Sequence, residues 1–509
     1  VVTGKAEHAV YIDIFNENVE IRDAGHLWGK GVYATVAALR RDDQSLQVAC
    51  IGPAGEKQVN LSGIAFGMRN YASRGGLGAI MGSKDLKAVA VRGTKGLDVA
   101  EPDRLPALAE QISARIAKMP SYQEYPQWHY KLFSILEADG KSFFGNYDTS
   151  AWPERFEAYE RAEQFVKHAE FRPEACFACP LRCWAHIGIQ GVGGGSIAAC
   201  QGTLTSLVNF PKIKDLNKVW KAYLLCQDLG LDTSSTSAVI AYAMDLRGRG
   251  VLTDSDTEGL DVRYGNGDAL VDLVGRIARR EGLGNLLANG VKKASEVLGA
   301  EAQRQAVYTK GGLELWLMEI RPFKGTALAC AVTDSGSQNR ATYGLCEFYY
   351  RSMRKQAEAA AQHLVGTPEA AVPTEYRHKP ELVAAYENLH ILADSLGVCS
   401  IPFMPVGLDL WGAAYEMCTG LKITSQDLTT MAARIRTLER LFNVRIGLNR
   451  EDDTIADRMF QEPLEEGPWK GEVVDRDRFE QMKDEYYSLR GWDREGRPTQ
   501  ETLRRLGLE

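Results

Sequence analysis

The feature that most constrains this chain is a group of three closely spaced cysteines, Cys176, Cys179 and Cys183. Their C-x2-C-x3-C spacing lets one tight loop turn three thiolates toward an inorganic cluster, and a 4Fe-4S cluster needs a fourth ligand, which is often remote in sequence. Zinc is the rival, because C-x2-C is also half of a zinc site. A zinc ribbon would show a second C-x2-C or a nearby pair of histidines, and the sequence has neither. The spacing therefore favours an iron–sulfur cluster over zinc.

A fourth thiolate has to come from the remaining cysteines, among which Cys399 stands out. It closes the stretch Asp394-Ser-Leu-Gly-Val-Cys399, directly after a predicted helix over 381–396 and a glycine at the helix end. A loop of this kind is rigid and can present a thiolate. The same pattern also fits an ordinary helix end with a buried cysteine, and the residues alone leave both interpretations open.

A second loop, Gln227-Asp-Leu-Gly-Leu-Asp232, has the same outline. Each loop ends a helix and contains a glycine followed by an aliphatic and then a polar residue. Exposed backbone amides in such a turn suit phosphate or another anion. One loop of this kind is weak evidence, but two related ones, the second ending in a candidate cluster ligand, strengthen the interpretation of both as anion-binding loops.

The order of the apolar patterns predicts an α+β fold with a β-rich N-terminal base followed by two mainly α-helical domains. A length of 509 residues suits roughly three domains of about 150 residues. The predicted domains are 1–102, 103–309 and 310–509. Strands are predicted at 9–14, 19–22, 47–51 and 87–91, and helices at 105–118, 216–229, 232–246, 381–396 and 424–442.

Charge and composition exclude several classes of function. The net charge of −7 gives no overall basic surface for nucleic acid. No stretch of about 18 uncharged apolar residues is present, so no membrane span is predicted. Ten cysteines in a chain of this length are too sparse for a disulfide scaffold.

Taken together, these features resemble the tungsten-containing aldehyde ferredoxin oxidoreductase family. Further markers of the family are Ile51-Gly-Pro-Ala-Gly-Glu56 and the glycine-rich stretch 73–88, which begins Ser-Arg-Gly-Gly-Leu-Gly. Near the C-terminus come the markers 439–445, 450–453 and 486–493. The resemblance spans nearly the whole chain, and the combination of markers is highly specific.

The resemblance implies a tungsten or molybdenum ion held by two pterin cofactors, with a 4Fe-4S cluster beside one pterin. Electrons would pass to ferredoxin or an iron–sulfur partner subunit, and a magnesium ion would bridge the pterin phosphates. The implied cluster ligands are Cys176, Cys179, Cys183 and Cys399. The implied pterin contacts are Arg74, Gly75, Gly76, Gly230, Leu231, Asp232, Asp394, Gly397 and Val398.

The sequence departs from the family pattern at several positions. Gln227 stands where the first loop usually has Asp, and Val398 replaces a Leu in the second. Gln201 aligns with a Glu of the aldehyde-oxidising members, and Gln cannot act as a general base. The family's Glu-x-x-His, which bridges a dimer through a metal, is replaced by Trp220-Lys-Ala-Tyr223. These departures put aldehyde oxidation in question.

Three functions therefore remain open. The first is the interconversion of an aldehyde and a carboxylate. The second is reduction of an aromatic ring in a CoA thioester, as in the branch that contains the benzoyl-CoA reductase catalytic subunit, for which His129 is a conceivable proton donor. The third is a cofactor-bearing electron-transfer or structural subunit without catalysis. An ordinary surface histidine is the plainer interpretation of His129.

The start at Val1, inside a strand pattern, gives a further expectation. Relatives carry more residues ahead of this strand, so the β-rich base is expected to be incomplete, with the rest supplied by another chain or by more of the same polypeptide. An oligomer in an oxygen-poor cytoplasm is expected, because low-valent metals and iron–sulfur clusters of this type are sensitive to air.

Overall fold

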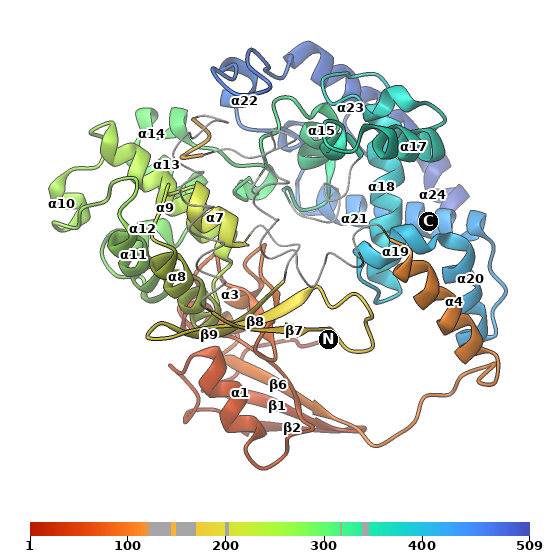
Figure 1. Cartoon of the computed structure of the whole chain (residues 1–509), viewed down its shortest axis with the longest axis horizontal. Helices are drawn as coiled ribbons and strands as arrows, with labels where there is room; N and C mark the ends of the chain where they lie inside the picture. Colours follow the sequence, from red (N-terminus) through yellow and green to blue (C-terminus); the bar gives the residue numbers. More distant parts are fainter. Residues whose placement is uncertain (120–121, 123–143, 149–168, 199–202, 316–317, 338–345) are drawn as a thin grey trace.

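The structure, a computed structural model of the chain, describes all residues except 120–121, 123–143, 149–168, 199–202, 316–317 and 338–345. It confirms the predicted α+β class, with a β-rich N-terminal region followed by mainly helical regions (Figure 1). No single helix among the described residues is long and apolar enough to cross a membrane. Two helices, Lys379–Ser395 and Ser400–Val406, meet those criteria only together, with a bend of 113° between them.

A six-stranded sheet forms the N-terminal region, in the order β2-β1-β6-β3-β4-β5. The predicted hairpin is present, because β1 and β2 pair antiparallel on either side of Asn16, whose φ of 53° suits a tight turn. Strand β6 pairs parallel with β1 and antiparallel with β3. The strands are β1 (Val10–Phe15), β2 (Asn18–Asp23), β3 (Gln47–Cys50), β4 (Ile64–Phe66), β5 (Asn70–Ala72) and β6 (Leu86–Arg92).

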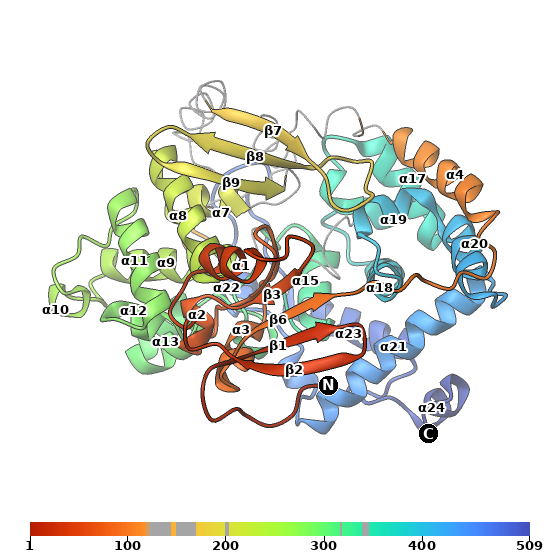
Figure 2. The ribbon, with the colours of Figure 1, turned by 90° about the horizontal axis from the view of Figure 1, so that it is seen from below.

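Helix α1 (Val32–Arg40) covers one face of this sheet (Figure 2). Its residues Val32 and Val36 pack on the inward side chains of β3 and β6, including Val48 and Ala90. Two short helices, α2 (Pro53–Glu56) and α3 (Leu77–Ser83), pack on each other at the end of the sheet. This arrangement brings the glycine-rich stretch 73–88 next to the helical part of the chain.

A second, three-stranded antiparallel sheet lies beyond the first, with strands β7 (Glu170–Glu174), β8 (Trp184–Ile189) and β9 (Gly193–Ala198). The apolar pattern predicted only helices here. It failed because β7 contains a proline and charged residues, and β9 begins with three glycines, so neither shows the alternation or the composition of a typical strand. The three clustered cysteines occupy the loop between β7 and β8.

The helices that follow β9 form the largest core cluster, around α9, whose residues from Thr233 to Leu246 are all buried. The predicted helices over 216–229 and 232–246 are confirmed as α8 and α9. The helices of this part are α7 (Thr203–Asn209), α8 (Leu216–Leu229), α9 (Thr233–Gly248), α10 (Asp254–Thr257), α11 (Gly267–Arg279), α12 (Leu283–Leu287), α13 (Val291–Leu298) and α14 (Ala300–Gln305).

The C-terminal helices enclose a second core cluster, which includes Tyr486, Tyr487 and Trp492 of the charged tail. Helix α4 (Leu105–Ala117) packs against α19 and α20 of this part, although the predicted boundary at 103 groups it with the middle domain (Figure 1). The helices here are α15 (Lys324–Val332), α17 (Arg354–Val365), α18 (Lys379–Ser395), α19 (Ser400–Val406), α20 (Leu408–Thr419), α21 (Ser425–Arg445), α22 (Arg458–Gln461), α23 (Arg476–Arg490) and α24 (Gln500–Leu506), with 3-10 turns at Lys310–Gly312, Cys346–Tyr349, Pro368–Ala371 and Arg450–Asp452.

Candidate functional site

The first loop ends α8 with a left-handed glycine. Gly230 has a φ of 78°, and the amide of Leu231 donates to the carbonyl of Cys226 at 2.8 Å. Asp232 then begins α9, accepting a hydrogen bond from the amide of Ser235 at 3.0 Å. This is the glycine-terminated helix end that the sequence predicts, followed at once by an Asp cap.

The first loop is attached closely to the N-terminal region. The amide of Asp232 donates to the carbonyl of Leu61 at 2.8 Å, and the amide of Gly63 donates to the carbonyl of Gly230 at 3.0 Å. A Cβ atom added at Gly230 would lie 2.8 Å from the amide nitrogen of Gly52. Only glycine allows such an approach of two backbones, so the first loop has one fixed position relative to the sheet.

Arg74 connects this loop to the third part of the chain. Its Nη1 lies 3.3 Å from Oδ2 of Asp232, and its Nε donates to the carbonyl of Ser337 at 3.1 Å. Its Nη2 donates to the carbonyl of Glu314. Gly75 and Gly76 follow with φ values of 94° and 72°, and Gly76 begins α3. The structure thus brings the predicted Arg-Gly-Gly stretch and the first loop together.

The second loop repeats the backbone geometry of the first. Gly397 has a φ of 68°, and the amide of Val398 donates to the carbonyl of Ala393 at 2.9 Å. The amide of Gly397 donates to the carbonyl of Asp394 at 3.1 Å, as that of Gly230 donates to Gln227 at 3.3 Å. Cys399 then begins α19, in the position that Asp232 holds before α9. The two loops, which are similar in sequence, therefore also share the same pattern of backbone hydrogen bonds.

The two loops differ in their surroundings. In the first, Gln227 is buried, and its side-chain nitrogen donates to the hydroxyl of Thr233 at 3.4 Å. In the second, Asp394 and Gly397 are exposed, and a Cβ atom added at Gly397 would have no other atom within 4 Å. Gln227, which stands where the first loop of the family usually has Asp, thus has its side chain buried inside the protein.

The cysteine loop has an unusual backbone. Ala178 and Arg182 have φ values of 53° and 49°, and each directly precedes a cysteine. Residues other than glycine adopt this conformation only at a cost of about 1–3 kcal/mol when the surroundings fix it. The amide of Cys179 closes a turn onto the carbonyl of Cys176 at 3.1 Å. These two turns set the directions of Cys179 and Cys183.

Cys399 lies close to the three cysteines of the β7–β8 loop, which approaches α19 in both views (Figures 1 and 2). The pKa of its thiol is raised to about 11, mainly by burial and in part by the nearby thiols of Cys183, Cys179 and Cys176, even though the residue as a whole is exposed. Burial, followed by the neighbouring Cys183, also raises the pKa of Cys176. The predicted four-cysteine set is brought together from two distant parts of the sequence.

The surroundings of the four thiols bear on the kind of group that they could hold. Within the described ranges, no three His, Cys, Asp or Glu side chains are placed to hold a single metal ion. The thiols of Cys176, Cys179 and Cys183 lie near that of Cys399, and four neighbouring thiols suit a group of several metal atoms, each taking one thiolate, as in a 4Fe-4S cluster. Bound iron would also offset the cost of ionising thiols whose pKa burial has raised.

Two predicted residues, His129 and Gln201, lie outside the residues that the structure describes. The residues that replace the metal-bridging motif are described, and they are internal. Trp220 and Tyr223 stack at 5.1 Å, and they donate hydrogen bonds to the carbonyls of Gly193 and Ser196 in β9 at 3.1 and 2.6 Å. This surface of α8 therefore packs on the small sheet.

The sequence motifs do not identify several residues that position the first loop. The carboxylate of Asp228 accepts a hydrogen bond from the amide of Tyr33 at the start of α1, at 3.0 Å, and the hydroxyl of Tyr71 donates to the carbonyl of Gln227 at 2.7 Å. The carbonyl groups that hold Arg74 belong to the backbone, and any residue type can supply a carbonyl, so the sequence cannot point to them. Of these residues, only Asp228, an acidic residue inside the loop motif, could have been identified from the sequence.

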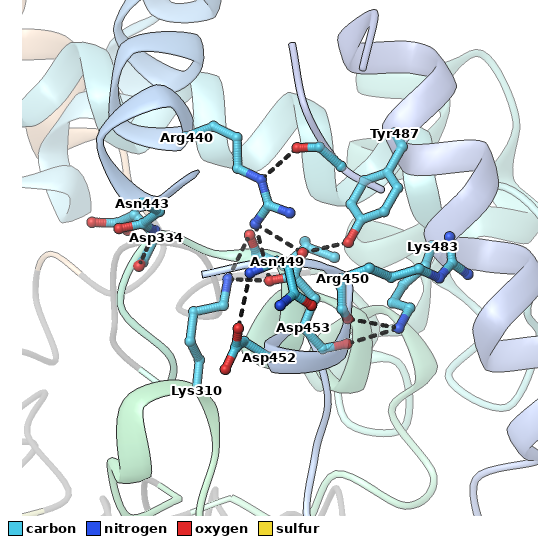
Figure 3. Close-up of polar contacts among 12 residues, drawn as sticks. Lys310, Asp334, Arg440, Asn443, Asn449, Arg450, Asp452, Asp453, Lys483 and Tyr487 are labelled. Carbon is cyan, nitrogen blue, oxygen red and sulfur yellow. Dashed lines mark hydrogen bonds and ion pairs between the residues drawn. The ribbon is translucent and has the colours of Figure 1, made fainter. Parts of the chain in front are cut away.

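A network of buried charged residues is connected to this site through Thr309 and Ser337, and Figure 3 shows the contacts around Asp453. The hydroxyl of Thr309 accepts a hydrogen bond from the amide of Ser337, the residue whose carbonyl holds Arg74. Lys310, which follows Thr309 in the sequence, forms an ion pair with Asp453 at 2.5 Å. Asp453 also forms an ion pair with Arg440 at 2.9 Å. Burial lowers the pKa of Lys310 to about 8, against the opposing effect of Asp453.

Known proteins resemble this chain over most of its length. Residues 1–93 match the N-terminal domain of aldehyde ferredoxin oxidoreductase, and residues 107–508 match its domains 2 and 3. The tungsten-containing aldehyde ferredoxin oxidoreductase of Pyrococcus furiosus is 32% identical over all of this chain and 81% of its own length. The WOR-like subunit of an aliphatic sulfonate oxidoreductase from the same organism is 28% identical over 80% of its length.

Among solved structures, a chain of the active site complex BamBC of benzoyl coenzyme A reductase, in complex with 1,5 dienoyl-CoA, superposes with a TM-score of 0.82. It is 27% identical, and the match covers 99% of this chain and 80% of that one. The family models match residues 1–93 and 107–508, and the chain belongs to the aldehyde ferredoxin oxidoreductase family.

Proposed function

We propose that this chain is a bis-pterin oxidoreductase that carries tungsten, or molybdenum, together with a 4Fe-4S cluster. It would interconvert an aldehyde and a carboxylate and pass electrons to ferredoxin or an iron–sulfur subunit. One observation carries the proposal: the second loop, whose geometry copies the first, ends on Cys399 beside the cysteine triplet. A pterin on that loop and a cluster on those thiols would then be neighbours.

The chain's own residues would hold these groups in distinct ways. The amides of the turns at Gly230–Leu231 and Gly397–Val398 would bind the two pterins, with Asp394 accepting hydrogen bonds from one of them. Arg74, fixed by Asp232 and two carbonyls, would lie against the pterin phosphates, where a magnesium ion would bridge them. Cys176, Cys179, Cys183 and Cys399 would bind the cluster. When bound, the metal supplies two-electron chemistry, and the cluster passes the electrons on singly.

Near the metal, the chain would supply an amide where aldehyde-oxidising relatives have a carboxylate. Oxidation of an aldehyde with water gives a carboxylic acid, two electrons and two protons, so a proton acceptor is needed. Gln201 could hold the substrate oxygen by a hydrogen bond but could not accept a proton. We infer that another group, with His129 as the candidate, would carry protons in this chain.

A second function is favoured by the solved relative whose complex contains 1,5 dienoyl-CoA. Reduction of an aromatic ring in a CoA thioester needs a proton donor beside the ring and a pocket closed to water. Such a reaction needs no carboxylate base near the metal. Gln201 and a donor histidine are compatible with it, which makes a CoA ester the main alternative substrate.

The test is a substrate panel on protein purified without oxygen and shown to contain tungsten or molybdenum. Small aldehydes with a viologen dye as acceptor are expected to give turnover. A CoA thioester of an aromatic acid, added with a reduced dye, would instead be consumed if ring reduction is the function. Metal-loaded protein that turns over neither substrate would indicate an electron-transfer or structural subunit, and protein without tungsten or molybdenum would contradict the proposal. Residence in an oxygen-poor cytoplasm and assembly into an oligomer remain parts of the proposal.

A further inference from the structure

Phe177 lies between two candidate cluster ligands and points fully into solvent. Its relative exposure is 100%, whereas Cys183, at the other end of the loop, is 8% exposed and packs in an apolar cluster with Leu181 and Trp184. The loop therefore buries Cys183 and turns its one aromatic side chain outward. A Phe side chain left in water forgoes about 1.5–3 kcal/mol of burial free energy, which becomes available when a partner covers it.

Basic side chains accompany Phe177. Arg172 on β7 and Arg182 in the loop are exposed, and neither forms an ion pair with another described residue. The neighbouring acidic residue Glu174 is already paired with Arg69 at 3.3 Å. This hairpin thus combines an apolar centre with two exposed arginines, against one exposed carboxylate, that of Glu170 at the start of β7, so it keeps a small excess of positive charge although the chain as a whole carries a net charge of −7.

The same surface is the one nearest to the thiols. A cavity of about 670 Å³ opens here, lined by Cys176, Cys179, Ala178 and Arg182 of the loop and by Ser113 of α4. Cys176 and Cys179 are only half-buried. Because electron transfer weakens steeply with distance, a redox partner has its shortest approach to these thiols across this loop.

We propose that Phe177, with Arg172 and Arg182 around it, is the docking surface for a one-electron carrier, an iron–sulfur protein with an acidic rim around its own cluster. The inference rests on the proposed function and names the partner's contact. In the transfer, the carrier's cluster gains the one electron that the reduced cluster of this chain loses, and no bond or proton moves. An aromatic centre with a charged rim is the usual composition of a binding hot spot.

The experiment measures the affinity of the metal-loaded protein for a purified, negatively charged ferredoxin with two 4Fe-4S clusters, at low and at physiological salt. Phe177→Ala is expected to weaken binding about tenfold at both salt concentrations. Arg172→Glu is expected to weaken it about tenfold at low salt and to flatten the salt dependence. The controls are Val297→Ala and Lys293→Glu, which change an exposed apolar and an exposed basic residue on α13, and they should leave binding unchanged.

Each variant is also assayed for iron content, for the electron paramagnetic resonance signal of its reduced cluster and for turnover with a viologen dye, all of which should match wild type. Unchanged affinity in both Phe177→Ala and Arg172→Glu, with iron and dye turnover intact, overturns the docking proposal alone. Wild-type protein that contains no iron overturns the proposed function itself. The two failures are therefore distinguishable.

Discussion

The guanidinium of Arg74 lies 3.3 Å from the carboxylate of Asp232, joining the N-terminal region to the start of α9. The side chains of both residues are at most 10% exposed, and the same guanidinium donates to carbonyls of Ser337 and Glu314. One side chain thus ties together three separate parts of the sequence at the first loop. The position of that loop depends on this contact as well as on its own backbone.

Replacing Arg74 should therefore affect both stability and cofactor content. Arg74→Ala leaves the buried Asp232 carboxylate unpaired and is expected to lower the free energy of unfolding by about 3–5 kcal/mol. Arg74→Lys keeps the charge but loses the planar fork, so it should fold better and still contain less pterin than wild type. Denaturant unfolding of the cofactor-free protein and pterin released from the purified protein measure the two effects.

A matched control for Arg74 is Arg92, which pairs with the buried Asp13 at 2.9 Å in the same region. Arg92→Lys alters a similar ion pair away from the loops, and its pterin content should equal that of wild type. Equal losses of pterin in Arg74→Lys and Arg92→Lys would mean that Arg74 acts only through general stability.

The two loop glycines should respond differently to alanine. At Gly397 the added methyl group meets open space, so Gly397→Ala should cost only the left-handed strain, about 1 kcal/mol. At Gly230 the added Cβ would lie 2.8 Å from the backbone nitrogen of Gly52, so Gly230→Ala must also move one backbone away from another. Urea unfolding of both variants should show the larger loss for Gly230→Ala. Equal losses would contradict the close packing of the first loop.

The ion pairs around Asp453 should contribute measurably to the free energy of unfolding. Asp453 is fully buried between Lys310 and Arg440, so Asp453→Asn leaves two buried cations without their partner and should lower the free energy of unfolding by about 3–5 kcal/mol at neutral pH. Adding Lys310→Met to Asp453→Asn should recover part of the loss, because one unpaired charge is removed. A double-mutant cycle measures this coupling, and a double variant less stable than Asp453→Asn alone would contradict it.

The pH dependence of that loss has a defined sign. Burial acts to raise the pKa of Asp453, but Lys310 and Arg440 outweigh it and hold the pKa below the ordinary value of 3.8. A carboxylate with a lowered pKa contributes its full stabilisation above its unfolded pKa and loses it as pH falls through the folded one. The difference in unfolding free energy between wild type and Asp453→Asn, measured in urea from about pH 5 downward, should therefore shrink as the solution becomes more acidic. A difference that grew on acidification would contradict the lowered pKa.

Local signals were enough to predict much of this fold. The helices α8, α9, α18 and α21 begin and end within a few residues of the predicted bounds, because caps such as Asp232 and Thr424 and glycines such as Gly230 act locally. The β7–β9 sheet was not predictable in this way, because its glycine- and charge-rich strands are held by pairing with one another and by packing on α8. Tertiary contacts overrode local preference there.

Some parts of the candidate site could likewise be predicted from the sequence, and others could not. The cysteines and the loop glycines could be identified from spacing, and the structure then brought Cys399 beside the triplet from more than two hundred residues away in the sequence. The backbone carbonyls of Ser337 and Glu314 around Arg74 could not be identified, since any residue supplies a carbonyl. Residues 129 and 201 remain predictions, because both lie outside the described part of the chain.

The most direct test of the whole account is the iron, acid-labile sulfide and zinc content of protein purified without oxygen, for wild type and for Cys399→Ser. The account predicts about four iron and four sulfide per wild-type chain, and a loss of both in Cys399→Ser. Cys418→Ser, which changes an exposed cysteine outside the candidate set, is the control and should retain wild-type iron. Zinc without iron in the wild-type protein, or full iron in Cys399→Ser, would contradict the account.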